Sequence, residues 1–117
     1  MANFMFIYRG SNGEYQKLSP EQMQEIMQKW NNWIAEGFQK GWLLDAGDAL
    51  TMEVRMVNSK KVVTDGPFVE SKEIVGGYSL VKADSIEKAA ELAKSCPALL
   101  SDGLVEVRPL AGLAPKG

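Results

Sequence analysis

The stretch Asn3-Phe4-Met5-Phe6-Ile7-Tyr8-Arg9 has the sequence of a β-strand that is apolar on both faces. Successive side chains of a strand point to opposite faces, so positions 4, 6 and 8 point one way and positions 5 and 7 the other. Such a strand belongs in the interior of a sheet that is covered on both sides. The fold around this strand must therefore shelter two faces.

The longest predicted helix begins at Ser19-Pro20-Glu21-Gln22 and ends at Gly41. Ser19 and Gln22 form the S-x-x-Q pattern of a capping box, and Pro20 suits the first helical turn. An apolar stripe follows at steps of three and four residues, as one face of a helix requires. It consists of Met23, Ile26, Met27, Trp30, Ile34 and Gly37, with Trp33 and Phe38 on its flanks.

Further strands are expected near residues 51–57, at 74–81 and at 104–108, with a short extra strand at 62–64. Residues 42–44 and a loop at 45–48 lead into the first of these. The pair Gly76-Gly77 inside a strand predicts a bulge or a close approach by another backbone or ligand. A second helix is expected from Ser85 to about Ser95, after the capping pair Asp84 and Glu87.

This order is β-α-β-β-β-α-β. Without the short segment 62–64 it becomes the α+β, ferredoxin-like pattern β-α-β-β-α-β, in which both helices cover one face of an antiparallel sheet. The first strand is apolar on both faces, so the helix-free face needs a cover of its own. A second subunit or the C-terminal tail would supply it, and we expect a homodimer through the helix-free sheet face.

Composition and charge exclude several classes of protein. The 117 residues are 45% hydrophobic and 24% charged, values typical of a single globular domain over residues 1–117, with a frayed tail at 110–117. The net charge of −2 argues against nucleic-acid binding, which needs a basic surface. The apolar run at 4–8 is too short to cross a membrane and lacks the features of a signal peptide. We expect a cytoplasmic protein with no nucleic-acid or membrane partner.

The sequence contains no histidine, and Cys96 is its single cysteine. Ser-His-Asp and Cys-His catalytic sites are thereby excluded, and nearly every catalytic zinc site with them. One cysteine cannot form an intrachain disulfide, and a reducing compartment suits such a chain. Asp45 and Asp48 supply too few oxygen ligands for Mg²⁺ or Ca²⁺, and no dinucleotide or phosphate-loop motif is present. We expect no metal and no cofactor.

The turn Asp65-Gly66-Pro67-Phe68 is the most distinctive motif, and two interpretations of it are open. In one, Asp65 caps backbone N–H groups of a tight turn, since Asp-Gly and Gly-Pro are ordinary turn formers. In the other, the rigid turn holds the Asp65 carboxylate at the mouth of a pocket as a general acid or base. Candidate pocket residues are Arg55, Phe68, Lys72, Tyr78, Trp33 and Asp45. Of the helix tryptophans, Trp33 is the pocket candidate and Trp30 is expected in the core.

The wider segment 63–78, with its D-G-P-F, E-x-K-E and G-G-Y motifs, resembles the YCII-related family, in the branch named after its DGPF motif. Ser19-Pro20-Glu21, Gly41-Trp42-Leu43 and the closing segment 105–109 resemble that family as well. The resemblance implies a ferredoxin-like, dimeric α+β barrel. Some relatives are regarded as enzymes with a His-Asp pair, one of them a dehydrochlorinase of a chlorinated aromatic; that pair is absent here. The branch also resembles proteins encoded beside extracytoplasmic-function sigma factors, which implies a stress-linked role.

Two functions remain open at this point. The first is an acid/base enzyme for a small organic substrate, with Asp65, Asp45 or Asp48 as the acid or base. Arg55, Lys72 or Tyr78 would assist, the two cations by stabilising developing negative charge. The second is a non-catalytic ligand-binding or interaction module linked to stress signalling, and the missing histidine favours it.

Overall fold

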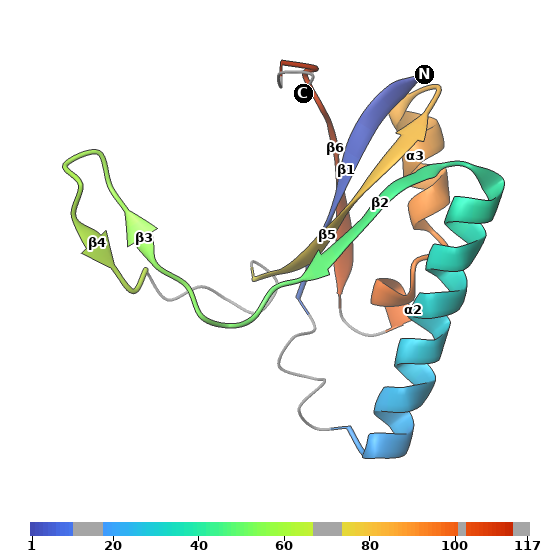
Figure 1. Ribbon diagram of the computed structural model, residues 1–117, viewed down its shortest axis with the longest axis horizontal. Helices are drawn as coiled ribbons and strands as arrows, with labels where there is room; N and C mark the ends of the chain where they lie inside the picture. The colour runs from blue at the N-terminus through green and yellow to red at the C-terminus, as the bar shows by residue number, and fades with distance from the viewer. Residues whose placement is uncertain (11–17, 67–73, 101–102, 114–117) are drawn as a thin grey trace.

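The computed structural model describes residues 1–10, 18–66, 74–100 and 103–113. Its body is a four-stranded antiparallel sheet in the order β2-β5-β1-β6, with two helices on one face (Figure 1). The elements of the body are β1 (Ala2–Arg9), α2 (Pro20–Lys40), β2 (Leu43–Ala49), β5 (Val75–Ala83), α3 (Ile86–Ala93), the 3₁₀ turn η2 (Pro97–Leu100) and β6 (Leu104–Pro109). This order is compatible with the predicted ferredoxin-like fold.

Strand β1 lies in the interior of the sheet, between β5 and β6, which confirms that part of the prediction. Phe4 and Phe6 point toward the helices and are 3% and 0% exposed. Met5 and Ile7 point to the helix-free face and are half-buried. The core therefore forms on the helix side of β1, and the other side of the strand keeps part of its apolar surface accessible.

Helix α2 begins and ends where the sequence predicts. The Ser19 side chain accepts the backbone N–H of Gln22, the Gln22 side chain accepts the N–H of Ser19, and both halves of the capping box are present. At the other end Gly41 adopts φ +84°, and its N–H donates to the carbonyl oxygen of Gly37. A left-handed residue at this place is the usual end of a helix.

Helix α3 is shorter than predicted, and its cap is a different residue. The N-cap is Ser85, whose hydroxyl accepts the N–H of Lys88 at 3.1 Å, so the predicted Asp84–Glu87 capping pair is wrong. The helix consequently begins at Ile86 and places Ala89 and Ala93 in the core. These small side chains allow the helix to lie close to the sheet.

The second strand of the sheet is β2, and the prediction of that strand near residues 51–57 is wrong. The register of β2 against β5 shifts on either side of Asp45, and Gly47 has φ +69°. These irregularities break the two-residue alternation by which a strand is recognised in a sequence. Residues 51–57 instead contribute only β3 (Met56–Val57), which pairs with β4 (Val63–Thr64) in a separate two-stranded sheet.

The predicted close approach at Gly76-Gly77 is confirmed. A Cβ atom on Gly77 would lie 2.8 Å from the carbonyl oxygen of Asp48 on β2, which is too close for a side chain. The register between β1 and β5 also shifts at this level, opposite Tyr8 and Arg9. Gly77 therefore allows β2 and β5 to approach each other closely, at the level where the register between β1 and β5 shifts.

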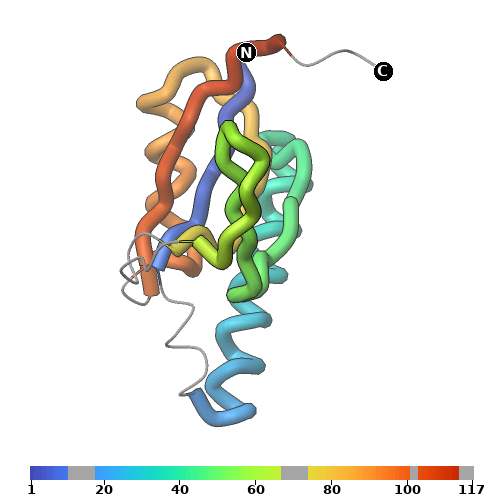
Figure 2. The backbone as a smooth tube through the Cα atoms, turned by 90° about the vertical axis from the view of Figure 1, so that its left-hand side faces the viewer, coloured from blue at the N-terminus to red at the C-terminus, as the bar shows by residue number. Residues whose placement is uncertain are grey.

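Residues 50–66, here called the arm, contain β3, β4 and the turn between them. Figure 1 shows the arm on the side of the sheet opposite the helices, and Figure 2 shows it in front of the helix-free face. Asn58 forms the turn between β3 and β4: its side chain accepts the N–H groups of Lys60 and Val62. Across the described ranges, no helix is long and apolar enough to cross a membrane.

Candidate functional site

A cleft of about 490 Å³ lies between α2 and the β2–β5 half of the sheet. The side contributed by α2 consists of Met23, Ile26, Met27, Trp30, Asn31 and Ile34. Residues 46–52 and 76–78 form the opposite side, and Tyr8 reaches the cleft from β1. Its surface is mainly apolar, and the polar residues Tyr8, Asn31, Asp48, Thr51 and Tyr78 are among those that line it.

A chain of two hydrogen bonds fixes the hydroxyl of Tyr8. The Tyr8 O–H donates to Ser79 Oγ at 2.7 Å, and the Ser79 O–H donates to the carbonyl oxygen of Ala46 at 2.7 Å. A carbonyl oxygen only accepts, so the direction of both bonds is fixed. The Tyr8 ring meets the edge of Trp30 at 5.0 Å between centroids. The Tyr8 hydroxyl therefore donates its proton to Ser79, and its oxygen can still accept a hydrogen bond from another group.

Burial changes the acidity of two groups near the cleft. It holds the pKa of Tyr8 well above its usual range and raises the pKa of the Cys96 thiol to about 12, against the opposing effects of their hydrogen bonds. Both groups are therefore protonated at neutral pH.

These shifts predict an alkaline loss of stability. The native state binds both protons more tightly than the unfolded chain, so the stabilisation is complete below the ordinary pKa values of 9.0 and 10.0. It is lost as the pH rises through the raised values. Urea unfolding should show a decline that begins near pH 9, and Cys96→Ala should make the decline shallower. A free energy of unfolding that is constant up to about pH 11 would contradict this account.

The predicted catalytic residue, Asp65, does not line the cleft. Its side chain is 91% exposed on the arm, where its carboxylate lies 3.6 Å from Arg55 Nε. Arg55, also on the arm, lies 3.9 Å from Glu53 as well. Phe68 and Lys72 lie outside the described residues. The structure thus brings Asp65 and Arg55 together but places them apart from Tyr78, which does line the cleft.

The two loop aspartates differ in position. The Asp45 carboxylate accepts the N–H of Gly47 at 2.7 Å, and this residue does not line the cleft. Asp48 lines the cleft and stands opposite Tyr78 in the sheet register. In the described residues, no three His, Cys, Asp or Glu side chains are close enough to hold a metal ion.

The two tryptophans of α2 are placed the other way round from the prediction. Trp33 is 4% exposed, stacks on Phe6, and donates from Nε1 to Ser95 Oγ at 2.9 Å. Trp30 is half-buried and lines the cleft. The helix packs on the sheet through Trp33 and Gly37. The centre of the apolar stripe, at Trp30, therefore faces the cleft beside β2. The prediction assumed that the centre of the stripe would contact the sheet.

Sequence reasoning missed Tyr8 and Ser79 as site residues. A signal was present, because Tyr8 shares a strand face with Phe4 and Phe6 and its hydroxyl requires a partner when buried. Its partner Ser79 lies 71 residues away in the chain and is 1% exposed. No local spacing connects these two positions.

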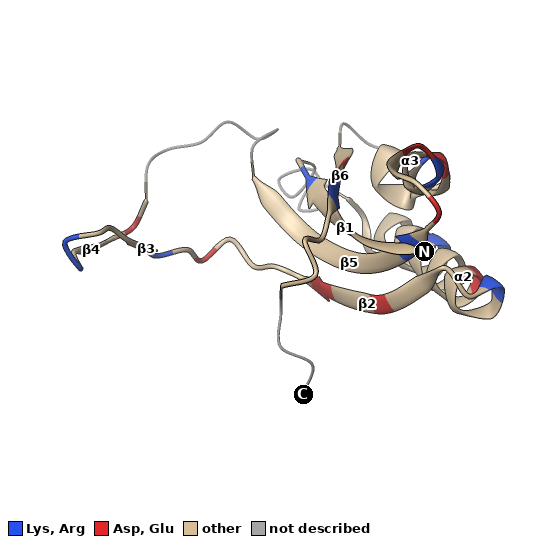
Figure 3. Cartoon of the chain, turned by 90° about the horizontal axis from the view of Figure 1, so that it is seen from above, with Lys and Arg blue, Asp and Glu red and all other residues tan. Residues whose placement is uncertain are grey.

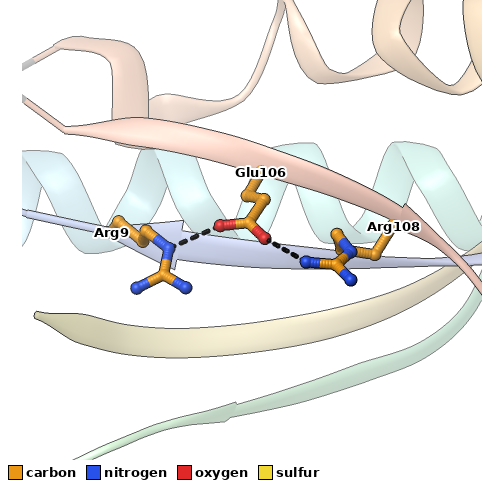
Figure 4. A network of polar contacts seen from close by, with 3 residues as sticks. All are labelled: Arg9, Glu106 and Arg108. Carbon is orange, nitrogen blue, oxygen red and sulfur yellow. Dashed lines mark hydrogen bonds and ion pairs between the residues drawn. The ribbon is translucent and has the colours of Figure 1, made fainter. Parts of the chain in front are cut away.

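The helix-free face carries a cluster of three charged side chains that the sequence did not indicate. Glu106 on β6 accepts from Arg9 Nε at 2.6 Å and from Arg108 NH1 at 3.1 Å (Figure 4). The hydrogen bond from Arg9, and then that from Arg108, lowers the pKa of Glu106. The β6 side of this face therefore carries two guanidinium groups and one carboxylate.

Comparisons with known proteins test the family resemblance found in the sequence. An uncharacterised protein of Rhizobium meliloti (strain 1021) is 43% identical over 51 residues, which are 43% of this chain and 41% of that relative. This chain thus matches less than half of the relative's length. The profile of the YCII-related domain, by contrast, matches residues 2–113, nearly the whole chain. The chain therefore belongs to the family of YCII-related domains.

Proposed function

We propose that this chain is a homodimeric ligand-binding protein whose cleft takes a small, largely apolar organic molecule with one hydrogen-bond donor. The observation that carries the proposal is the Tyr8–Ser79–Ala46 hydrogen-bond chain beside an apolar cleft. A volume of about 490 Å³ lies within the usual range for small-molecule pockets. Apolar walls with a few fixed polar groups are also the usual composition of such pockets.

The fixed hydroxyl of Tyr8 selects the polarity of the ligand. Since the Tyr8 proton is directed at Ser79, the remaining capacity of the oxygen is to accept. An alcohol, phenol or amine satisfies it, whereas an ether or a carboxylate leaves it unpaired at a cost of about 1–3 kcal/mol. Trp30 and Ile34 supply flat and aliphatic surface for the rest of the molecule.

Binding is better supported than catalysis, because the carboxylate proposed as an acid or base, Asp65, is exposed to solvent and does not line the cleft. A proton-transferring enzyme is the second candidate, and Asp48 is the observation that favours it. Asp48 is the one carboxylate among the cleft residues that the structure describes, and it stands beside Tyr78. Chemical conversion of a bound probe would support the enzyme.

Three further assignments belong to this proposal. The homodimer forms through the helix-free face, whose centre contains Met5, Ile7 and Leu80, all half-buried. Together the two sheets make the dimeric α+β barrel that the family resemblance implies. The Asp65-Gly66-Pro67-Phe68 sequence supports the DGPF branch, with a stress-linked role by association, and the buried free thiol of Cys96 suits the cytoplasm.

The cleft is tested with a matched pair of probes, 2-naphthol and 2-methoxynaphthalene, which differ in the hydrogen-bond donor. At about 1 mM, a probe with a Kd near 0.1 mM stabilises the native state by about 1.4 kcal/mol, a rise in Tm of several degrees. We expect this rise with 2-naphthol and a smaller one with the ether. Tyr8→Phe should remove the difference between the two probes, because it removes the accepting oxygen.

Two tryptophan substitutions on α2 provide the control. Asn31→Trp places an indole in the cleft and should abolish the response to both probes. Gln28→Trp, on an exposed part of the same helix that does not line the cleft, should leave the response intact. Equal responses in both variants would show that the probes bind elsewhere and would overturn the proposed site. Chromatography of the same mixtures detects any product and so decides between binding and catalysis.

A further inference from the structure

The arm exposes an unusual amount of apolar surface for its size. Val54, Met56, Val57, Val62 and Val63 are between 49% and 66% exposed. A two-stranded hairpin by itself is marginally stable in water, and contiguous exposed apolar surface usually marks an interaction site. The arm therefore has the composition of a segment that another surface covers.

The arm projects from the face of the sheet that also needs a cover. In Figure 1 the helices lie on one side of the sheet and the arm extends from the other. Figure 2 looks onto the helix-free face and shows the arm in front of it. A molecule that docks on the half-buried Met5, Ile7 and Leu80 must therefore meet the arm as well.

Charge indicates which molecule fits this combined surface. The turn of the arm carries Lys60 and Lys61, and β2 carries the exposed Asp45 and Asp48 (Figure 3). In a twofold dimer every contact occurs twice, so a contact between the basic turn of one arm and the acidic strand of the other copy would form twice in one interface. The same chain thus supplies an apolar face, an apolar arm that can cover it, and a basic turn and an acidic strand of opposite charge. This combination favours a second copy over an unrelated protein.

We propose that each arm lies across the helix-free face of a second copy of this chain, and that this exchange fixes one wall of the cleft. The second part rests on the proposed function. Residues 50–52 are both the base of the arm and part of the cleft lining, so the position of the arm sets the position of that wall. Formation of the dimer and binding in the cleft are then coupled, and each strengthens the other.

Oligomeric state tests the first part. Light scattering during size-exclusion chromatography should report a dimer for the natural chain at micromolar concentration. Val57→Asp places a charge at a 66% exposed position of β3 and should weaken the dimer by about 100-fold, because a twofold interface contains the change twice. Asn58→Asp adds the same charge at the next residue, keeps a side-chain oxygen for the turn, and should change the affinity by at most about threefold.

A spin label at Val62→Cys locates the arm directly. Cys96 is 2% exposed with a raised pKa, so maleimide reagents modify the new thiol alone. In mixed dimers of spin-labelled and isotope-labelled chains, we expect signal broadening at Ile7 and Leu80 amides of the isotope-labelled copy. A monomeric natural chain, a dimer that survives Val57→Asp, or a dimer without this broadening would each overturn the arm exchange.

The coupling is measured with 2-naphthol as the probe. If the arm fixes the cleft wall, Val57→Asp should lower the affinity for 2-naphthol at least threefold, while Asn58→Asp should not. Unchanged affinity in a monomeric Val57→Asp variant would overturn the coupling and leave the cleft intact. Absence of 2-naphthol binding to the natural chain would instead contradict the proposed function, and the spin-label result would stand independently.

Discussion

Replacing Phe6 by alanine is expected to lower the free energy of unfolding by about 3–5 kcal/mol, the usual range for a large core side chain. Phe6 is 0% exposed, lies on the central strand β1, and stacks on Trp33 with ring centroids 6.3 Å apart. The loss removes buried apolar area and leaves a cavity that α2 and the sheet cannot close. The free energy of unfolding of a small domain is only about 5–15 kcal/mol in total, so the variant should be close to unfolding.

Phe38→Ala provides the matched control for this substitution. Phe38 has the same side chain but is 50% exposed near the end of α2, and its removal should cost no more than about 1 kcal/mol. Urea unfolding followed by far-ultraviolet circular dichroism measures both values. A Phe6→Ala variant that is as stable as Phe38→Ala would show that the core is not centred on β1.

Gly47→Ala should destabilise the protein by at least about 3 kcal/mol, the second of the largest effects. Gly47 has φ +69°, and a Cβ atom there would lie 1.8 Å from the carbonyl oxygen of Tyr78 on β5. No rotation of a side chain relieves a contact between two backbones, so β2 must move away from β5. Because Tyr78, Asp48 and Ala46 line the cleft, 2-naphthol binding should be lost together with stability.

Gly41→Ala separates the two causes of this effect. Gly41 has a similar conformation, φ +84°, but a Cβ atom there meets nothing within 4 Å. Its substitution therefore costs only the left-handed backbone conformation, about 1–2 kcal/mol. The difference between the two variants measures the clash alone. Equal losses at both positions would contradict the close approach of β2 and β5 at Gly47.

Much of the fold was predictable because its signals are local. The capping box of Ser19 and Gln22, the stop at Gly41 and the two-sided apolar pattern of β1 depend on residues within one element. The second strand was not predictable in this way. Its backbone pairs with β5 through two register shifts, so its side chains do not alternate, whereas the alternating segment at 51–57 belongs to the arm.

The candidate site was less predictable than the fold. Tyr78 lines the cleft, whereas Trp33 is a core residue and Asp65 is an exposed residue of the arm. The choice between Trp30 and Trp33 depends on the rotation of α2 about its axis. That rotation is set by the contacts of α2 with Leu43 and the rest of the sheet. The spacing of apolar residues within the helix does not reveal those contacts.

By itself, the sequence determined the bounds of the first helix, the interior place of the first strand in the sheet and the absence of imidazole chemistry. Each of these depends on residue type or on neighbours a few positions away. Only the tertiary structure decided where the cleft lies and which groups line it, because Tyr8, Ala46 and Ser79 meet across 71 and 33 residues of chain. A hydrogen bond between such distant groups follows from strand register and helix packing, and these are properties of the folded chain as a whole.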